Sequence, residues 1–201
     1  ITRQMLVNDN LGAIQDVLND QSTAVAQFEE GKFFELLASD GPTLLETGRA
    51  LFNTTDKTKA GTAAAITVAS LGLARAEMMK KTTKDGRKLS IAPAILLVSP
   101  DKLTEAEQIV TAIAPAQSDK VNPFSGRLRP VSTAQIDGNA WYLFAEPSML
   151  PVFEYGLLDG YTAPRMRIDE PFGVQGMSVS VEHDFGCGAI DFRGAYKNAG
   201  A

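Results

Sequence analysis

The chain has 201 residues, enough for one sizeable domain or two small lobes, and its 44% hydrophobic and 21% charged residues are ordinary for a globular protein. Its 19 basic and 24 acidic residues give a net charge of −5, which disfavours general nucleic-acid binding because that activity needs a basic face. A single cysteine excludes an intrachain disulfide and a thiolate zinc cluster, and no apolar run has the length that spans a bilayer.

The first predicted element is one long helix over residues 9–38. Asp9 or Asn10 is placed to cap it, and apolar side chains recur at helical spacing from Leu11 to Phe28. At roughly 1.5 Å per residue, such a helix would cross most of a small domain. The sequence "SDGP" that follows contains the glycine and proline that commonly end helices.

Residues 43–66 read as a loop, and the polar stretch 53–61 within them is expected to be mobile. A second helix is predicted over residues 70–81. Ser70 is a suitable N-cap because its hydroxyl can accept a hydrogen bond from a free backbone N–H of the first turn.

The apolar run over residues 93–100 is bounded by prolines and predicts a strand that is buried on both faces. A third helix then extends to about residue 114. It starts either at Ser99, with proline at the first helical position, or at Thr104, where Glu107 would complete a capping box.

Residues 131–145 predict two strands around a turn at Asp137 and Gly138. Residues 67–145 therefore form a compact α/β lobe. The last third differs, because "PVFEYGLL", "RMRIDEPF" and "MSVSVEHDF" predict long antiparallel strands. We expect two lobes, one built from the long helix with the late strands and the other inserted between them.

The only histidine, His183, and the only cysteine, Cys187, lie four residues apart near the C-terminus. Residues 177–189 alternate with period two, which places both side chains on the apolar face of a strand. Four residues of regular strand span roughly 13 Å, whereas metal ligands must lie within about 2.0–2.3 Å of the ion and a Cys–His pair needs hydrogen-bond reach. We therefore interpret both as packing residues and predict no metal site.

Other chemical motifs are incomplete. The sequence "GCGAID" begins like a dinucleotide-binding fingerprint, but Asp191 stands in place of the third glycine and too little chain follows, so no cofactor is expected. There is no Gly-x-Ser-x-Gly, and Ser125 has no assignable partner. The carboxylate pairs of the chain read as solvated surface charge: Glu105 with Glu107, and Asp169 with Glu170. We predict no catalytic residue.

The basic stretch from Arg75 to Lys88 is a candidate contact surface for a polyanion or for an acidic neighbouring subunit. The alternative is a solvated helix end and turn, and the absence of interleaved aromatic residues weakens the case for nucleic acid. Its members are Arg75, Lys80, Lys81, Lys84, Arg87 and Lys88.

An ordered series of segments carries a family resemblance: "ITRQMLVNDNLGAI", "GRALFNTT", "APAILLVSP", "NPFSGRLRPV", "NAWYLFAEP", "PVFEYGLLDG" and "GAIDFRGAYKNAG". Together they resemble the major capsid (major head) protein of Mu-like prophages and related tailed phages. In some of these phages the capsid domain is encoded behind a Clp-type head maturation protease.

The resemblance implies an α+β fold of the Hong Kong 97 type, with a long spine helix, a peripheral lobe of long β-strands and an axial α/β lobe. Residues 1–54 would hold the spine helix, at 10–38, and the start of the peripheral lobe. Residues 55–149 would form the axial lobe, 150–190 the long peripheral strands, and 191–201 the return to the axial lobe.

The function implied is that of a structural head subunit, which is not an enzyme and which assembles as hexamers and pentamers of an icosahedral shell in the bacterial cytoplasm. A scaffold or maturation protease and packaged DNA, held without sequence specificity, would be its partners; no membrane is involved. Such proteins usually begin with an extended arm, and nothing before Ile1 supplies one. We therefore expect a fragment that is monomeric or weakly associated in dilute solution.

Two alternatives stay open at this point. One is a hydrolase or protease-type enzyme, which would need His183 beside Cys187 or Ser125. The other is a polyanion-binding module that uses the stretch from Arg75 to Lys88.

Overall fold

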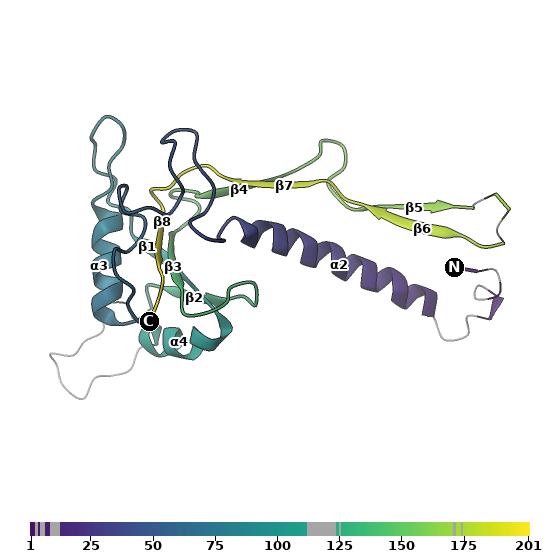
Figure 1. The fold of residues 1–201 in the computed structure, drawn as a ribbon, viewed down its shortest axis with the longest axis horizontal. Coiled ribbons are helices and arrows are strands. Elements are labelled where there is room, and N and C mark those ends of the chain that lie inside the picture. The colour runs from purple at the N-terminus through teal and green to yellow at the C-terminus, as the bar shows by residue number, and fades with distance from the viewer. Residues whose placement is uncertain are drawn as a thin grey trace. The chain divides into compact units, whose positions relative to one another are not determined.

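The computed structural model describes residues 1, 2, 4, 7, 8, 13–111, 124, 126–170, 172, 173 and 175–201 (Figure 1). These residues form two compact units. Unit 1 comprises Ile1–Phe33 and Tyr155–Cys187, and unit 2 comprises Phe34–Glu154 and Gly188–Ala201. Helices and largely antiparallel strands occur in both parts of the chain, which places it in the α+β class.

The long helix of unit 1, α2, runs over Ala13–Glu35 and confirms the predicted helix over the described part of its range. It ends before residue 38 because the N–H groups of Leu37 and Ala38 bond to carbonyls three residues back, at 2.9 and 3.1 Å, which tightens the chain into a turn. The predicted caps Asp9 and Asn10 lie outside the described residues.

The late strands of unit 1 include a two-stranded antiparallel ribbon, β5 (Arg165–Asp169) with β6 (Ser178–Glu182). Its register places Met166 opposite Val181 and Ile168 opposite Val179, so that one face of the ribbon is apolar and the other carries charged and serine side chains. A second two-stranded sheet joins β4 (Phe153–Leu157) and β7 (Phe185–Ala189). The predicted antiparallel strands are thus present in shorter pieces.

Unit 2 is organised by a four-stranded sheet in the order β2-β1-β3-β8. The strands are β1 (Pro93–Val98), β2 (Arg129–Ser132), β3 (Trp141–Ala145) and β8 (Ala195–Asn198). As predicted, β1 is buried on both faces, since Leu96, Leu97 and Val98 are all buried. It pairs in parallel with β2 and antiparallel with β3.

The two strands predicted around the turn at Asp137 and Gly138 are present as β2 and β3, but they do not form a hairpin. The turn exists, with Gly138 at φ +80, but β2 and β3 lie on opposite sides of β1 and do not pair with each other. The fully buried β1 needs a hydrogen-bonding partner on each edge, and these two strands supply them.

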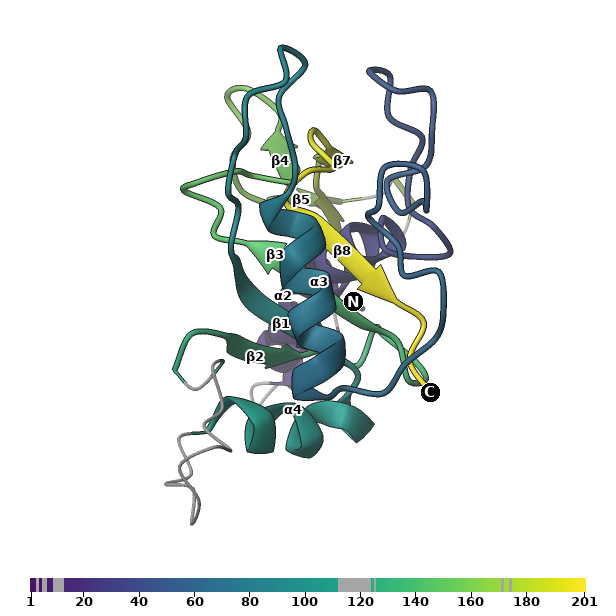
Figure 2. The ribbon, with the colours of Figure 1, turned by 90° about the vertical axis from the view of Figure 1, so that its left-hand side faces the viewer.

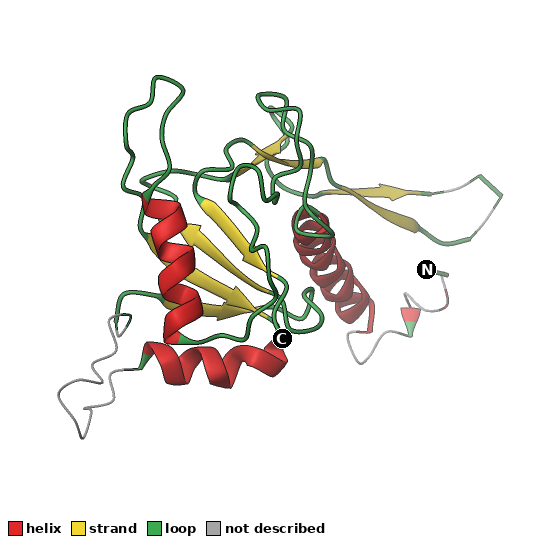
Figure 3. Ribbon diagram, turned by 60° about the vertical axis from the view of Figure 1, so that its left-hand side comes forward, coloured by secondary structure: helices red, strands yellow, loops and turns green. Residues whose placement is uncertain are grey.

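Two apolar clusters cover the two faces of this sheet. The first joins α3 (Val68–Met79) and α4 (Leu103–Val110) to the sheet through residues such as Leu71, Met78 and Trp141 (Figures 2 and 3). The second packs Leu51 and Phe52 against the opposite face. Because successive strand side chains alternate, Leu96 and Val98 belong to the first cluster and Leu97 to the second.

The helix starts of unit 2 differ in part from prediction. Thr67, not Ser70, is the N-cap of α3; Ser70 is the third helical residue of a capping box in which each side chain bonds to the other's backbone N–H. The start at Ser99 is the correct one of the two alternatives, because a short 3₁₀ turn, η1 (Pro100–Lys102), precedes α4. Thr104 therefore lies inside α4.

The polar stretch 53–61 is ordered, in contrast to the expected mobile loop. Thr58 is fully buried, and its hydroxyl donates a hydrogen bond to the Leu51 carbonyl at 2.8 Å. The backbone of Thr58 and Ala60 also bonds to Lys197 of β8 at 2.8 Å each. These polar residues therefore extend the sheet edge, which their composition does not indicate.

Candidate functional site

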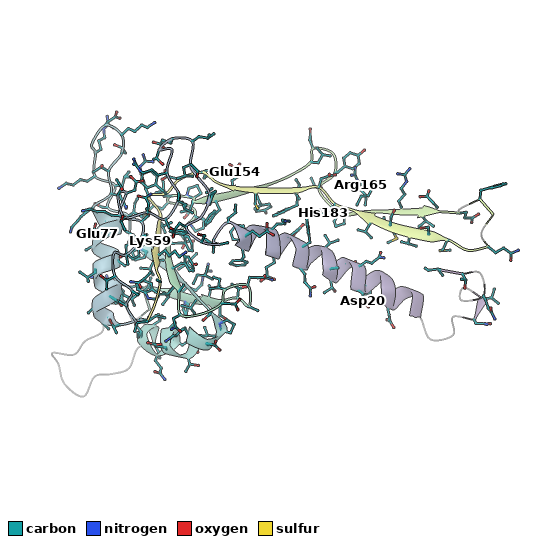
Figure 4. All side chains as sticks on the ribbon, viewed as in Figure 1. Asp20, Lys59, Glu77, Glu154, Arg165 and His183 are labelled. Carbon is teal, nitrogen blue, oxygen red and sulfur yellow. The ribbon has the colours of Figure 1, made fainter. Side chains whose placement is uncertain are left out.

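His183 lies at the junction of β6 and β7 and points toward α2 within unit 1 (Figure 4). Its side chain is only 6% exposed, and its Nε2 atom is 2.5 Å from Glu29 Oε1. The ring stacks on Phe185 with a centroid distance of 6.4 Å, while its Nδ1 atom is buried without a hydrogen-bond partner among the described residues. A histidine held by one carboxylate and one aromatic ring is a packing contact of the kind predicted.

Cys187 contacts α2 separately from His183. Its Sγ atom lies 3.5 Å from the Lys32 carbonyl, three residues along the helix from Glu29. The alternation of the strands therefore places both side chains against α2 but gives each its own contact. Among the described residues, no group of three histidine, cysteine, aspartate or glutamate side chains is placed to hold a metal ion.

Charged side chains occupy the opposite face of the ribbon. Arg165 lies 2.7 Å from Asp184 and 3.7 Å from Glu182, and its guanidinium stacks on the Tyr161 ring at 3.9 Å (Figure 4). The two carboxylates flank His183 in sequence but contact Arg165, whereas His183 contacts Glu29. The arrangement is an internal ion pair network on a two-stranded ribbon.

The other candidate catalytic residues are dispersed. Ser125 lies outside the described residues. Glu105 pairs with Lys102 at 3.2 Å, and Asp169 lies 3.8 Å from Arg167, both at the surface. These contacts are typical of solvated surface carboxylates.

The basic stretch is largely engaged within unit 2. Arg75 stacks over the Phe124 ring at 4.7 Å, Lys80 lies 3.7 Å from Glu77, and Lys84 lies 3.2 Å from Glu46. Arg87 and Lys88 are exposed. The cations therefore do not form one free patch, which weakens the case for a polyanion-binding surface.

Lys81 is the member of this stretch whose chemistry is most altered. It is buried, and its Nζ atom donates a hydrogen bond to the Asp56 carbonyl. Burial lowers the pKa of Lys81 to about 8, partly offset by the negative charges of Asp56 and Glu77. Nothing in the sequence distinguishes this lysine from its neighbours.

Two further cations were not predicted from the sequence, half-buried Arg193 and buried Lys197. Arg193 lies 3.0 Å from Glu46 and 2.9 Å from Asp191, and it also donates to the carbonyl of Thr82, so that it joins three segments of unit 2. Lys197 lies beside the contacting rings of Phe52 and Tyr142, at 5.6 and 5.5 Å from their centroids.

Burial lowers the pKa of Lys197. Its partners, like Glu46 and Thr82 in the case of Arg193, are far away in sequence, so no local pattern reveals them.

The described helices include none with the length and apolar character that crossing a membrane requires. The geometry defines an α+β protein in which most buried charged and reactive side chains make structural contacts. A family model described as phage capsid protein matches residues 1–198, and the chain belongs to this family.

Phage capsid proteins are structural proteins that form the shell of the virion. The match supports the predicted capsid subunit, its place in a shell of many subunits, and its location in the virion. A search of curated proteins found no match to the sequence.

Proposed function

We propose that the chain is the structural subunit of the head shell of a tailed bacteriophage or prophage of the Mu-like kind. Copies of the subunit would assemble, as hexamers and pentamers, into an icosahedral shell around DNA in the bacterial cytoplasm. The observation that carries this proposal is the family match over residues 1–198.

We further propose the Hong Kong 97-type arrangement for the fold. In this proposal α2 is the spine helix, the β5–β6 ribbon belongs to the peripheral lobe, and the sheet of unit 2 is the core of the axial lobe. The two compact units support this division, and the lobe limits at residues 54, 149 and 190 remain predictions. The sheet position of β8, beside β3, supports the return of the last residues to the axial lobe.

The proposal includes no catalytic role. His183 is used in a contact with Glu29, Cys187 contacts the Lys32 carbonyl, and Lys81 is buried against the Asp56 carbonyl. These contacts favour a structural role over a hydrolase or maturation protease. A maturation protease and a scaffold are instead proposed partners that act on, or with, the shell.

The proposed contact with packaged DNA is weak and independent of sequence. The net charge of −5 supports this view, because tight binding to a polyanion releases counterions through many basic contacts. The partial neutralisation of the basic stretch by Glu46 and Glu77 supports it further.

Sedimentation velocity over a wide range of protein concentration tests the function. We expect a monomer at the dilute end and species of ring or shell size as the concentration rises, because shells are built from many weak contacts between copies. A chain that stays monomeric up to its solubility limit would contradict the proposal.

A further inference from the structure

The helix α3 of unit 2 is apolar on two separate faces. Its inner face, with Leu71, Ala74 and Met78 fully buried, packs in the core of the unit. A second set of apolar residues faces away from that core. We call this set the outer face of α3, and it consists of Val68, Ala69, Gly72, Leu73, Ala76 and Met79.

The outer face is continuous. At 100° per residue its six members fall within an arc of about 140° on the side away from the buried residues, and Lys80 at the end of the helix is the one charge within that arc. The charged residues on the flanks have partners within the subunit. Arg75 stacks on Phe124, and Glu77 lies 3.5 Å from Lys57 and 3.7 Å from Lys80.

Small residues run along the middle of the outer face. Gly72 lies there with Ala69 and Ala76 one turn to either side, and a Cβ added at Gly72 would meet nothing within 4 Å. Larger apolar side chains flank these small residues. Leu73 is 71% exposed on one side, and Val68 and Met79 are 42% and 44% exposed on the other.

A solvent-facing helix surface normally carries charged and polar side chains. Three turns without a central charge leave an apolar patch on the order of a few hundred Å², the size at which such patches commonly mark interaction sites. Single exposed residues such as Leu45, which is 104% exposed on a loop, need no such explanation. The outer face differs from such single residues because its apolar residues are contiguous.

We infer that the outer face of α3 is a contact surface for a second copy of the chain. This inference rests on the proposed function, which supplies many identical neighbours. The flanking charges agree with it, because Lys57 and Lys80 are paired with Glu77 inside the subunit, so an apolar neighbour would not have to bury an unpaired lysine.

The size of the face also agrees with a shell contact. A stable pair of proteins buries about 800 Å² on each partner, and the outer face supplies only part of that area. It would therefore form the apolar centre of a contact with a polar rim. Such a contact is weak alone and becomes effective when it is repeated around a ring.

The test compares the concentration dependence of association for three forms of the full chain by sedimentation velocity. Leu73→Lys places a charge at one edge of the outer face, within the proposed contact, and lysine is as good a helix former as leucine, so the subunit should keep its fold. Leu45→Lys is the matched control, with the same substitution at a more exposed leucine outside the face. Circular dichroism and thermal melting verify the fold of each form.

We expect Leu73→Lys to weaken association at least tenfold and Leu45→Lys to change it less than twofold. If Leu73→Lys does not fold, Gly72→Gln replaces it with the same expectation, because it adds a polar side chain to the face from a position with open space above it. A variant of the face that associates as strongly as the wild type overturns the inference alone. A wild-type chain that never associates overturns the proposed function as well.

Discussion

Replacing Thr58 with valine tests whether the polar stretch 53–61 is a part of the core of unit 2. The Thr58 hydroxyl donates to the Leu51 carbonyl at 2.8 Å and accepts from the Asn53 N–H at 2.9 Å, and the side chain is fully buried. Valine has nearly the same shape but makes neither bond, so the buried Leu51 carbonyl and the half-buried Asn53 N–H each lose a partner.

The expected loss of stability is large for a substitution that only replaces the hydroxyl group by a methyl group. An unsatisfied buried group costs about 1–3 kcal/mol and the half-buried Asn53 N–H costs about 1 kcal/mol, so Thr58→Val should lower the free energy of unfolding by about 2–4 kcal/mol in total. For a chain of this length that corresponds to a fall in Tm of about 5–15 °C. Thr58→Ser keeps the hydroxyl and loses one buried methyl group, at a cost of about 1 kcal/mol.

Urea unfolding followed by circular dichroism measures both variants against the wild type. We expect Thr58→Val to be clearly less stable than Thr58→Ser. A valine variant within about 0.5 kcal/mol of the wild type, or one more stable than the serine variant, would refute the role given to the hydroxyl.

The remaining predictions concern Lys81, Gly72 and the segment that contains His183 and Cys187. The pKa of Lys81 is about 8 in the folded chain and about 10.5 when unfolded, so between these values the unfolded chain binds more protons and stability should rise with pH. Lys81→Met should lack this rise in urea unfolding at pH 8 to 10.5, and an identical pH slope would contradict the assignment. Gly72→Ala should raise the free energy of unfolding by about 0.5–1 kcal/mol, because alanine favours the helix and its Cβ meets nothing within 4 Å; a loss of stability would show that the space is occupied. His183 and Cys187 make separate contacts with α2, so calorimetric titration with Zn²⁺ should detect no stoichiometric binding. Stoichiometric binding to the wild type that disappears in His183→Gln would show that a metal site exists.

Local patterns in the sequence predicted the elements that depend on local physics. The helix over Ala13–Glu35 follows from apolar spacing, and β1 follows from a continuous apolar run between prolines. The separation of His183 from Cys187 followed from the length that four residues of extended strand span.

Features that depend on long-range pairing were not predictable in the same way. The positions of β2 and β3 on opposite edges of β1 are decided by the sheet as a whole, and a Gly138 turn is compatible with a hairpin or with a crossover. Arg193 and Lys197 bind partners more than a hundred residues away, such as Glu46 and the Ser39 carbonyl. The outer face of α3 could not be predicted, because the sequence of an apolar helix does not indicate which of its residues are buried.

Electron microscopy of the concentrated full chain tests the central claim most directly. The account predicts rings or closed shells of repeated subunits, in which the outer face of α3 is covered by a neighbouring copy. Images that show only dispersed monomers at concentrations close to the solubility limit would contradict the capsid function. Ordered assemblies that leave Leu73 uncovered would contradict the assignment of this surface.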